Sequence, residues 1–219
     1  MGAAGALLVA AGCVVPLDID IHDGFEVRGN GRVVSTARPV PAFDAVEASG
    51  GIRVVVERTG REGVVITAEE NLLPYLQVSV RGGVLHLGPE PGIDLRPRRE
   101  IVIHVESYEV VELAASGAVT MEAEVGWVPE LWVSLSGASV LTAWGEADVQ
   151  HATLSGASRY DGLDVDNLEA DLRLSGASQA FVWVRDRLDV EASGASQVRF
   201  RGNPWVAARV SGASSVTRY

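Results

Sequence analysis

The chain has 219 residues, of which 47% are hydrophobic and 21% charged, and its net charge is −11. This composition excludes a disordered chain, and the negative charge argues against nucleic acid as a partner and against attachment to anionic lipid by charge alone. The length fits one or two domains, and 24 glycines together with frequent valines favour an all-β protein.

Residues 3–15 form an apolar run that ends in Val9-Ala10-Ala11-Gly12-Cys13. The run is shorter than the roughly 20 residues that a membrane-spanning helix needs. It resembles the end of a bacterial lipoprotein signal peptide, in which small residues precede a cysteine that is acylated and becomes the mature N-terminus. It departs from that pattern in having no Lys or Arg ahead of the run and in having Ala10 where Leu is usual.

We therefore predict a signal segment over residues 1–13 with lipidation at Cys13. The protein would then be exported and held in the cell envelope by a lipid anchor, either in the periplasm or at the cell surface. A buried N-terminal strand with an incidental cysteine is the alternative. Cys13 is the only cysteine, so it has no partner for a disulfide or for a C-x-x-C metal or redox site.

Residues 14–32 are predicted to be a linker. The carboxylates between Asp18 and Asp23 loosely resemble a calcium loop, but the bidentate glutamate that such a loop needs does not follow. Gly29-Asn30-Gly31 is typical of a turn.

Residues 33–112 contain several β-rich runs without a strict repeat, separated by turns such as Arg81-Gly82-Gly83. Ser49-Gly50-Gly51 looks like a degenerate copy of a motif that recurs further on. The basic stretch Arg96-Pro97-Arg98-Arg99 is interpreted as a solvated loop tip. We expect this part of the chain to form longer, irregular coils that cap the regular ones, because the terminal coils of a solenoid are atypical.

Five copies of Ser-Gly-Ala-Ser organise the second half of the chain. The leading serines, with that of a shortened first copy, Ser-Gly-Ala-Val, are spaced by 20, 19, 20, 18 and 18 residues, and they are Ser116, Ser136, Ser155, Ser175, Ser193 and Ser211. A fixed period in this range is typical of a solenoid. Apolar residues alternate on both sides of each copy, for example at Leu131, Val133 and Leu135, and from Leu168 to Leu174, which predicts strand, bend, strand.

The repeat length decides the fold. Eighteen to twenty residues at roughly 3.3 Å each give a circuit of about 60 Å, enough to surround a narrow core and return displaced by about 4.8 Å. No repeat has room for the helical crossover that otherwise joins parallel strands. We predict an all-β parallel β-helix or β-solenoid with about 18–20 residues per coil, regular over 113–219 and irregular over 33–112.

The Ser-Gly pairs are predicted to be structural corners. Glycine bends the chain at low steric cost, small neighbours let the coils approach, and stacked hydroxyls could exchange hydrogen bonds along the ladder. A nucleophilic serine would need a base, and the repeat region offers only His151. The glycines of the six corners are Gly117, Gly137, Gly156, Gly176, Gly194 and Gly212.

Acidic residues give two further hypotheses. Pectinase-like hydrolases and lyases use β-helices and carboxylates, for which the candidates are Asp161, Asp164, Asp166 and Asp171. Because the first three lie in one loop-like stretch that ends at Asn167, we do not favour catalysis. A calcium site at Asp164, Asp166 and Asn167 is the second hypothesis, with surface charge the simpler account.

Two tryptophans are candidates for binding at the surface. Trp132 and Trp183 each stand between inward-facing residues and should point away from the core. Exposed aromatic rings stack on sugars or fill a pocket of a partner. Packing against an N-terminal coil or a second chain is the alternative.

Several segments together resemble the bacterial "head GIN" family. They are Gly29-Asn30-Gly31, Phe43-Asp44-Ala45-Val46, Ser49-Gly50-Gly51-Ile52-Arg53-Val54, Glu69-Glu70-Asn71-Leu72-Leu73-Pro74-Tyr75, Gly83-Val84-Leu85-His86-Leu87 and the Leu-Ser-Gly-Ala-Ser repeats. The resemblance covers residues 33–219 and implies a β-helix-like domain of unknown function in a secreted or lipid-anchored envelope protein. It brings no catalytic residues.

Three function classes follow. The first, which we prefer, is a non-enzymatic envelope adhesin or surface-binding module whose partner is a protein, a glycan or a second copy. The second is a structural or sensory component of an envelope signalling system, and the third is the carbohydrate-active enzyme. No cofactor, metal or nucleic acid is expected, whereas membrane contact through the lipid anchor and self-association through open solenoid edges are.

Overall fold

The computed structural model describes residues 25–219, so Cys13, the predicted signal segment 1–13 and most of the predicted linker lie outside it. The described part is almost entirely β-strand, and its one helix is η1 (Leu73–Tyr75); none of its helices could cross a membrane. The strands are β1 (Phe25–Arg28), β2 (Val33–Arg38), β3 (Ala45–Gly50), β4 (Arg53–Arg58), β5 (Gly63–Glu69), β6 (Leu76–Arg81), β7 (Val84–Pro89), β8 (Ile93–Arg96), β9 (Val102–Ser107), β10 (Glu112–Gly117), β11 (Thr120–Leu135), β12 (Val140–Leu154), β13 (Arg159–Leu174), β14 (Gln179–Ala192), β15 (Gln197–Arg201), β16 (Trp205–Val210) and β17 (Ser215–Arg218).

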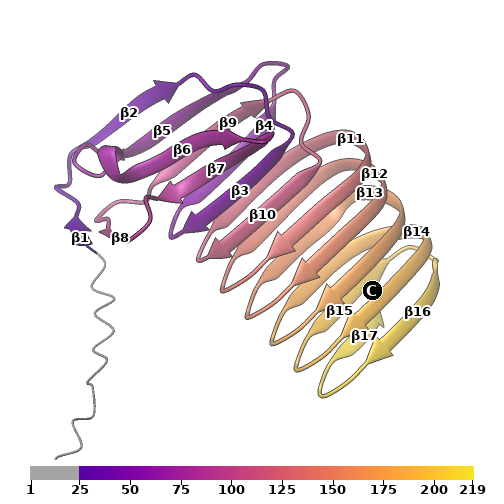
Figure 1. Ribbon diagram of the computed structural model, residues 1–219. Coiled ribbons are helices and arrows are strands. Elements are labelled where there is room, and N and C mark those ends of the chain that lie inside the picture. The colour runs from indigo at the N-terminus through magenta and orange to yellow at the C-terminus, as the bar shows by residue number, and fades with distance from the viewer. Residues whose placement is uncertain (1–24) are drawn as a thin grey trace, which may run out of the picture.

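The second half of the chain is a flattened β-solenoid (Figure 1). The long strands β11 to β14 each run around most of one coil, and each pairs in parallel with the next. Thr120 lies beside Val140, and Val140 beside Arg159, so the register advances by one repeat per coil. Every second side chain points inward and is buried, because a strand alternates its faces. The predicted all-β parallel solenoid is confirmed.

The Ser-Gly-Ala-Ser copies form the corners between successive long strands, and Figure 1 shows them in one row along one edge. The glycine of each corner has a positive φ, for example +73° at Gly156. The alanine N–H that follows donates to the glycine carbonyl of the previous coil, at 2.7 Å from Ala157 to Gly137. The corners therefore continue the hydrogen-bond ladder from coil to coil.

The fourth residue of the motif, which the sequence did not single out, is the buried one. The side chains of Ser139, Ser158, Ser178 and Ser196 are at most 1% exposed. Each hydroxyl donates to the carbonyl of its own leading serine, at 2.8–2.9 Å. These hydrogen bonds close each turn internally. Between coils, the leading hydroxyls of Ser175 and Ser193 donate at 3.5 and 3.4 Å to backbone carbonyls of the preceding coil, and not to other hydroxyls.

A second bend divides each long strand in the middle. In β11 and β12 it falls at Gly126 and Gly145, both with positive φ. The pairing of β13 with β14 shifts register on both sides of Asn167, which takes the buried position and leaves Leu168 39% exposed. Leu168 therefore does not belong to the inward alternation that the sequence predicted, because a bulge moves every following side chain to the other face.

The N-terminal half forms the expected irregular cap, but its coils are not stacked in chain order. The coil of β3 and β4 lies next to β10 and β11, with Ser49 and Gly50 in register with Ser116 and Gly117. Outside it lies the later coil of β7 and β9. The outermost layer is antiparallel, with β6 on β7 and with β5 and β2 beyond β9. A two-residue Gly82-Gly83 turn, both residues with positive φ, reverses the chain between β6 and β7.

A buried carboxylate fastens the start of the folded chain to this cap. Glu69 is fully buried, and its carboxylate accepts hydrogen bonds from the backbone N–H of Gly31 and, at 2.7 Å, of Arg98. Burial raises the pKa of Glu69, but the N–H groups of Arg98, Gly31 and Arg99 outweigh it and hold that pKa below the usual value. The basic stretch at residues 96–99 is therefore not only a solvated loop tip, because the backbone N–H groups of Arg98 and Arg99 bind the Glu69 carboxylate.

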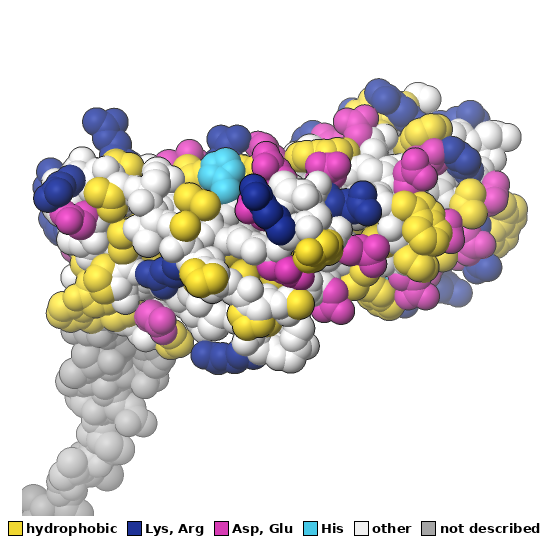
Figure 2. Space-filling model, turned by 90° about the horizontal axis from the view of Figure 1, so that it is seen from above, with side chains coloured by type: hydrophobic (Ala, Val, Ile, Leu, Met, Phe, Trp, Pro, Cys, Tyr) yellow, Lys and Arg dark blue, Asp and Glu magenta, His cyan; other side chains and the backbone are white. Residues whose placement is uncertain are grey.

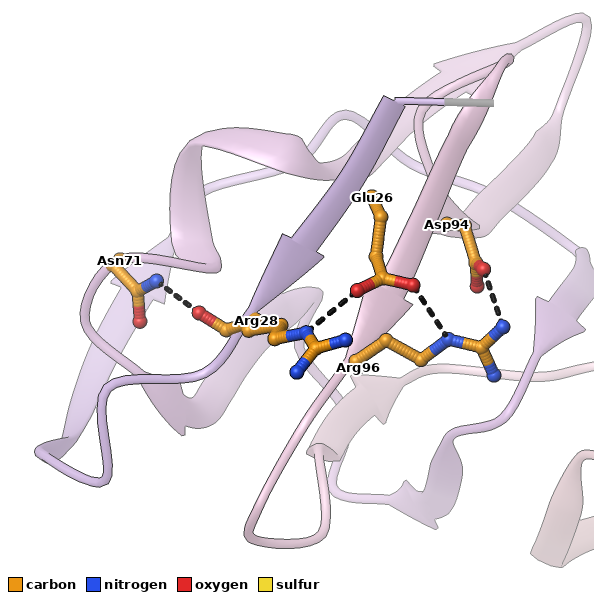
Figure 3. Close-up of polar contacts among 5 residues, drawn as sticks. All are labelled: Glu26, Arg28, Asn71, Asp94 and Arg96. Carbon is orange, nitrogen blue, oxygen red and sulfur yellow. Dashed lines mark hydrogen bonds and ion pairs between the residues drawn. The ribbon is translucent and has the colours of Figure 1, made fainter. Parts of the chain in front are cut away.

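Residues 25–32, predicted as linker, are part of the fold. β1 pairs in parallel with β8, and the Asn71 side chain donates to the Arg28 carbonyl at 2.8 Å (Figure 3). On the outer side of this two-stranded sheet, Glu26 lies 2.6 Å from Arg28 and 3.6 Å from Arg96. The sequence did not predict strand β1 because it has only four residues, and its partner β8, also of four residues, lies about 65 residues further along the chain.

Candidate binding surface

Three connected hollows run along one outer face of the solenoid. Their volumes are about 310, 510 and 540 Å³. The first two share Thr153 and follow one another beside the corner serines, whereas the third shares Arg173, Glu191 and Arg209 with the second and lies on the other side of that row. We call this hollowed strip the groove face; it consists of the outward side chains of residues 45–48, 112–115, 130–135, 149–154, 169–174, 187–192 and 205–210 and of the corner serines beside them.

The in-register stacking of the coils lines the groove with rows of side chains. One row runs from Glu47 through Ala114, Ser134, Thr153, Arg173, Glu191 and Arg209. The half nearer the cap is therefore lined by small side chains and the leading corner serines. The other half is lined by ion pairs, with Arg209 at 2.9 Å from Glu191 and Arg187 at 2.6 Å from Asp189.

Trp132 lies on the groove face in the neighbouring row. Its side chain is 47% exposed, and one side of its ring stacks on His151, with ring centroids 4.0 Å apart and planes inclined by 21°. The Nδ1 atom of His151 lies 3.3 Å from a carboxylate oxygen of Asp171 on the next coil. Three successive coils thus place an indole, an imidazole and a carboxylate in one line.

Trp183 is exposed as well, but it lies on the opposite face of the coil, near the second bend. It is 36% exposed, and the guanidinium of Arg185 lies 5.6 Å from its ring centroid. Asp166, its register partner, is bonded to the same arginine. The two tryptophans that the sequence proposed therefore do not form one site.

The four aspartates of the enzyme hypothesis are on strand β13, not in a loop, and they have separate partners. Asp161 lies 3.4 Å from Arg159, Asp166 is bonded to Arg185, and Asp171 faces His151. Asp164 is exposed. Within residues 25–219 no group of three or more His, Cys, Asp or Glu side chains is placed to hold a metal ion.

The hypothesis of a calcium site that includes Asn167 is not supported by the position of that side chain. That side chain is buried, and its amide nitrogen donates to the carbonyls of Val165 and Trp183, at 3.1 and 2.7 Å. Its role in the described structure is to join β13 to β14 at the bulge.

The remaining surface mixes charges. In Figure 2, which looks onto the molecule from above, acidic and basic side chains are interspersed, with hydrophobic ones between them. This is not the single-sign surface that phosphate backbones select. Further exposed large hydrophobic side chains in the regular half are Trp127, Trp205, Val206, Val210 and Tyr219.

Sequence reasoning found Trp132 and the leading serines but not the groove between them. The groove lies two residues ahead of each corner, at positions such as Ala114, Ser134 and Thr153. Their small size in consecutive repeats is the pattern that could have located it.

Comparison with known proteins agrees with this architecture. A family model described as "Putative auto-transporter adhesin, head GIN domain" matches residues 42–204. No curated protein matches the chain.

Solved structures resemble this one at low sequence identity. A "putative adhesin" from Bacteroides fragilis has a TM-score of 0.69 and 13% identity over 88% of this chain and 98% of its own. A "putative lipid binding protein" from Parabacteroides distasonis has a TM-score of 0.56 and 18% identity, and a "putative adhesin" from Parabacteroides merdae has 0.54 and 19%; both cover 89% of this chain and 99% of their own.

At these identities the structural similarity shows the fold alone. Neither the family description nor the name of any of these three structures is that of an enzyme. The family model, by contrast, spans most of the chain, and the segments noted in the sequence lie largely within it. The chain belongs to the head GIN domain family of auto-transporter-adhesin-like proteins.

Proposed function

We propose that this domain is a non-catalytic binding module of the bacterial cell envelope that holds an extended polymer lengthwise in the groove face. The observation that carries the proposal is that adjacent hollows follow the coils from β10 to β16. The leading corner serines line the first two hollows at every coil, which suits a ligand that is itself repetitive. The family's description as an adhesin supports a role at a surface.

A single substitution can block the groove without touching the core. Thr153 is exposed and lines both of the first two hollows. Thr142 is exposed on the same strand but on the opposite face, so it provides a matched control. Thr153→Arg should abolish binding of the folded domain to bacterial or host cells and to an array of immobilised polysaccharides. Thr142→Arg should bind like the wild type, and equal binding by all three proteins would disprove a groove ligand.

The proposed location in the cell envelope depends on lipidation of Cys13, and this is tested separately. The full chain, expressed in a bacterium fed an alkyne-tagged fatty acid, should become labelled and sediment with membranes. Cys13→Ala should be neither labelled nor retained. An unlabelled wild-type chain would remove the lipid anchor from the proposal and leave the groove unaffected.

A further inference from the structure

We infer that Trp132 is a stacking platform for an uncharged sugar ring of the groove ligand, an inference that rests on the function proposed above. Trp132 differs from two other exposed tryptophans, Trp183 and Trp205, in how its ring is held. The guanidinium of Arg185 lies over Trp183 and that of Arg187 lies over Trp205, at 5.6 and 5.7 Å from the ring centroids. Among the described residues, no arginine or second aromatic side chain takes such a place on the free side of Trp132.

The ring is fixed from behind. His151 covers one side at 4.0 Å, and Asp171 orients the imidazole from the next coil. A ring held in this way loses little side-chain freedom when a ligand binds, which is the general advantage of a preorganised site. The 47% of Trp132 that stays exposed is therefore held in a fixed position where a ligand can reach it.

The free side of the indole looks along the axis toward the preceding coil, because His151 occupies the side of the following one. The residue in register there is Glu112, and Glu130 and Ser134 flank Trp132 on the same face of its own strand. All three are exposed. Two carboxylates and a hydroxyl thus surround the platform.

This set of groups selects the ligand class. The C–H groups on one side of a pyranose ring are attracted to the negative face of an indole, while its hydroxyls can donate to carboxylates. Glu112 and Glu130 would repel uronic acids, sialic acids and phosphorylated sugars. The neighbouring hollow, lined by Ala114 and Ser134, has about 310 Å³, which is within the range of small-molecule sites.

A cationic peptide would also be attracted to an indole between two carboxylates. The rest of the groove offers such a peptide no net attraction, however, because Arg173, Arg187 and Arg209 are paired there with acidic side chains. An uncharged saccharide needs no net charge along the groove. The observations therefore favour the sugar.

The test uses the described domain and a panel of defined probes. These are soluble oligosaccharides of glucose, galactose, mannose and N-acetylglucosamine, with oligogalacturonate as the acidic probe and hexalysine as the cationic one. Binding is followed by calorimetry and by the change in tryptophan emission. We expect at least one neutral saccharide to bind, oligogalacturonate not to bind, and Trp132→Ala to weaken binding about tenfold or more.

Two further variants make the result specific. Trp132→Phe keeps an aromatic face and should lose less affinity than Trp132→Ala, whereas Trp183→Ala removes an exposed ring on the opposite face of the coil and should bind like the wild type. Thermal unfolding of each variant checks that the fold is intact. Because the Trp132 side chain is half exposed, its removal should hardly change the midpoint.

The outcomes separate this inference from the proposed function. If Thr153→Arg abolishes saccharide binding and Trp132→Ala does not change it, the platform is disproved and the groove stands. If neither change affects binding, both ideas fail. Trp132-dependent binding of hexalysine, or no binding of any neutral saccharide, would overturn the ligand class.

Discussion

A β-carbon on Gly156 would lie 2.5 Å from the carbonyl oxygen of Gly137 on the preceding coil. The same contact recurs at the neighbouring corners, with 2.5 Å from Gly176 to Gly156 and 2.4 Å from Gly194 to Gly176. The corners thus need glycine for two separate reasons, a positive φ and a backbone in the place of the side chain. Only the second reason depends on the coils being stacked in register.

Gly156→Ala should therefore cost more stability than an alanine at an ordinary left-handed glycine. Gly60 is the matched control, because its φ of +75° is close to the +73° of Gly156 but nothing lies within 4 Å of a β-carbon there. We expect Gly60→Ala to lower the free energy of unfolding by about 1 kcal/mol and Gly156→Ala by about 3 kcal/mol, since overpacking adds to the φ strain. Urea denaturation measures both. Equal losses would show that the corners do not need close contact.

Ser178→Ala should destabilise the protein by about 1 kcal/mol, because it removes a buried hydroxyl that donates to the Ser175 carbonyl at 2.8 Å. The control is the leading serine of the same corner. Ser175 is exposed, so Ser175→Ala should change stability by less than about 0.5 kcal/mol. Thermal unfolding of the two variants gives the comparison, and a reversed order would contradict this account of the motif.

This contrast shows what the sequence could and could not reveal about the corners. The repeat of Ser, Gly, Ala and Ser gives the fold and the coil length, because its period and the alternation around it leave one arrangement. It does not say which serine is structural, since both are small and polar. That difference arises only when the corner turns and places Ser178 inside while Ser175 stays at the surface.

The cap shows a second limit. Strand runs such as β4, β5 and β9 are visible as β-branched stretches, but their partners are set by contacts between distant segments. Asn167 points inward in place of Leu168 because of a bulge, and no local sequence pattern predicts that bulge. The groove, for the same reason, exists only once Ala114, Ser134 and Thr153 are brought side by side from three coils.

Glu69→Gln should destabilise the cap at neutral pH, and the loss should disappear in acid. The folded-state pKa of Glu69 is lowered, so the carboxylate contributes stability above its unfolded pKa of about 4.3, and that contribution is lost as the pH falls through the folded value. The amide of Gln cannot accept the N–H groups of Gly31 and Arg98 with both oxygens. Unfolding midpoints of the wild type and the variant should differ at pH 7 and converge as the pH falls through the folded-state pKa of Glu69. A constant difference across this range would assign Glu69 a purely steric role.

Gln150 and Tyr160 form a buried polar pair inside the regular coils, and their coupling can be measured. The Gln150 amide nitrogen donates to the Tyr160 hydroxyl, while the Gln150 carbonyl oxygen has no hydrogen-bond partner among the described residues. Burial raises the pKa of Tyr160, so the phenol stays neutral across the physiological range.

Tyr160→Phe alone leaves the Gln150 amide without its acceptor and should cost about 1–3 kcal/mol. The double change Gln150→Leu with Tyr160→Phe removes both polar groups and the unpaired oxygen. It should therefore be less destabilising than the sum of the single changes by about 1 kcal/mol or more. Urea denaturation of the wild type, both single variants and the double variant completes the cycle. Additive losses would mean that the two side chains do not act as a pair, and that a polar group in this narrow core is tolerated without a partner.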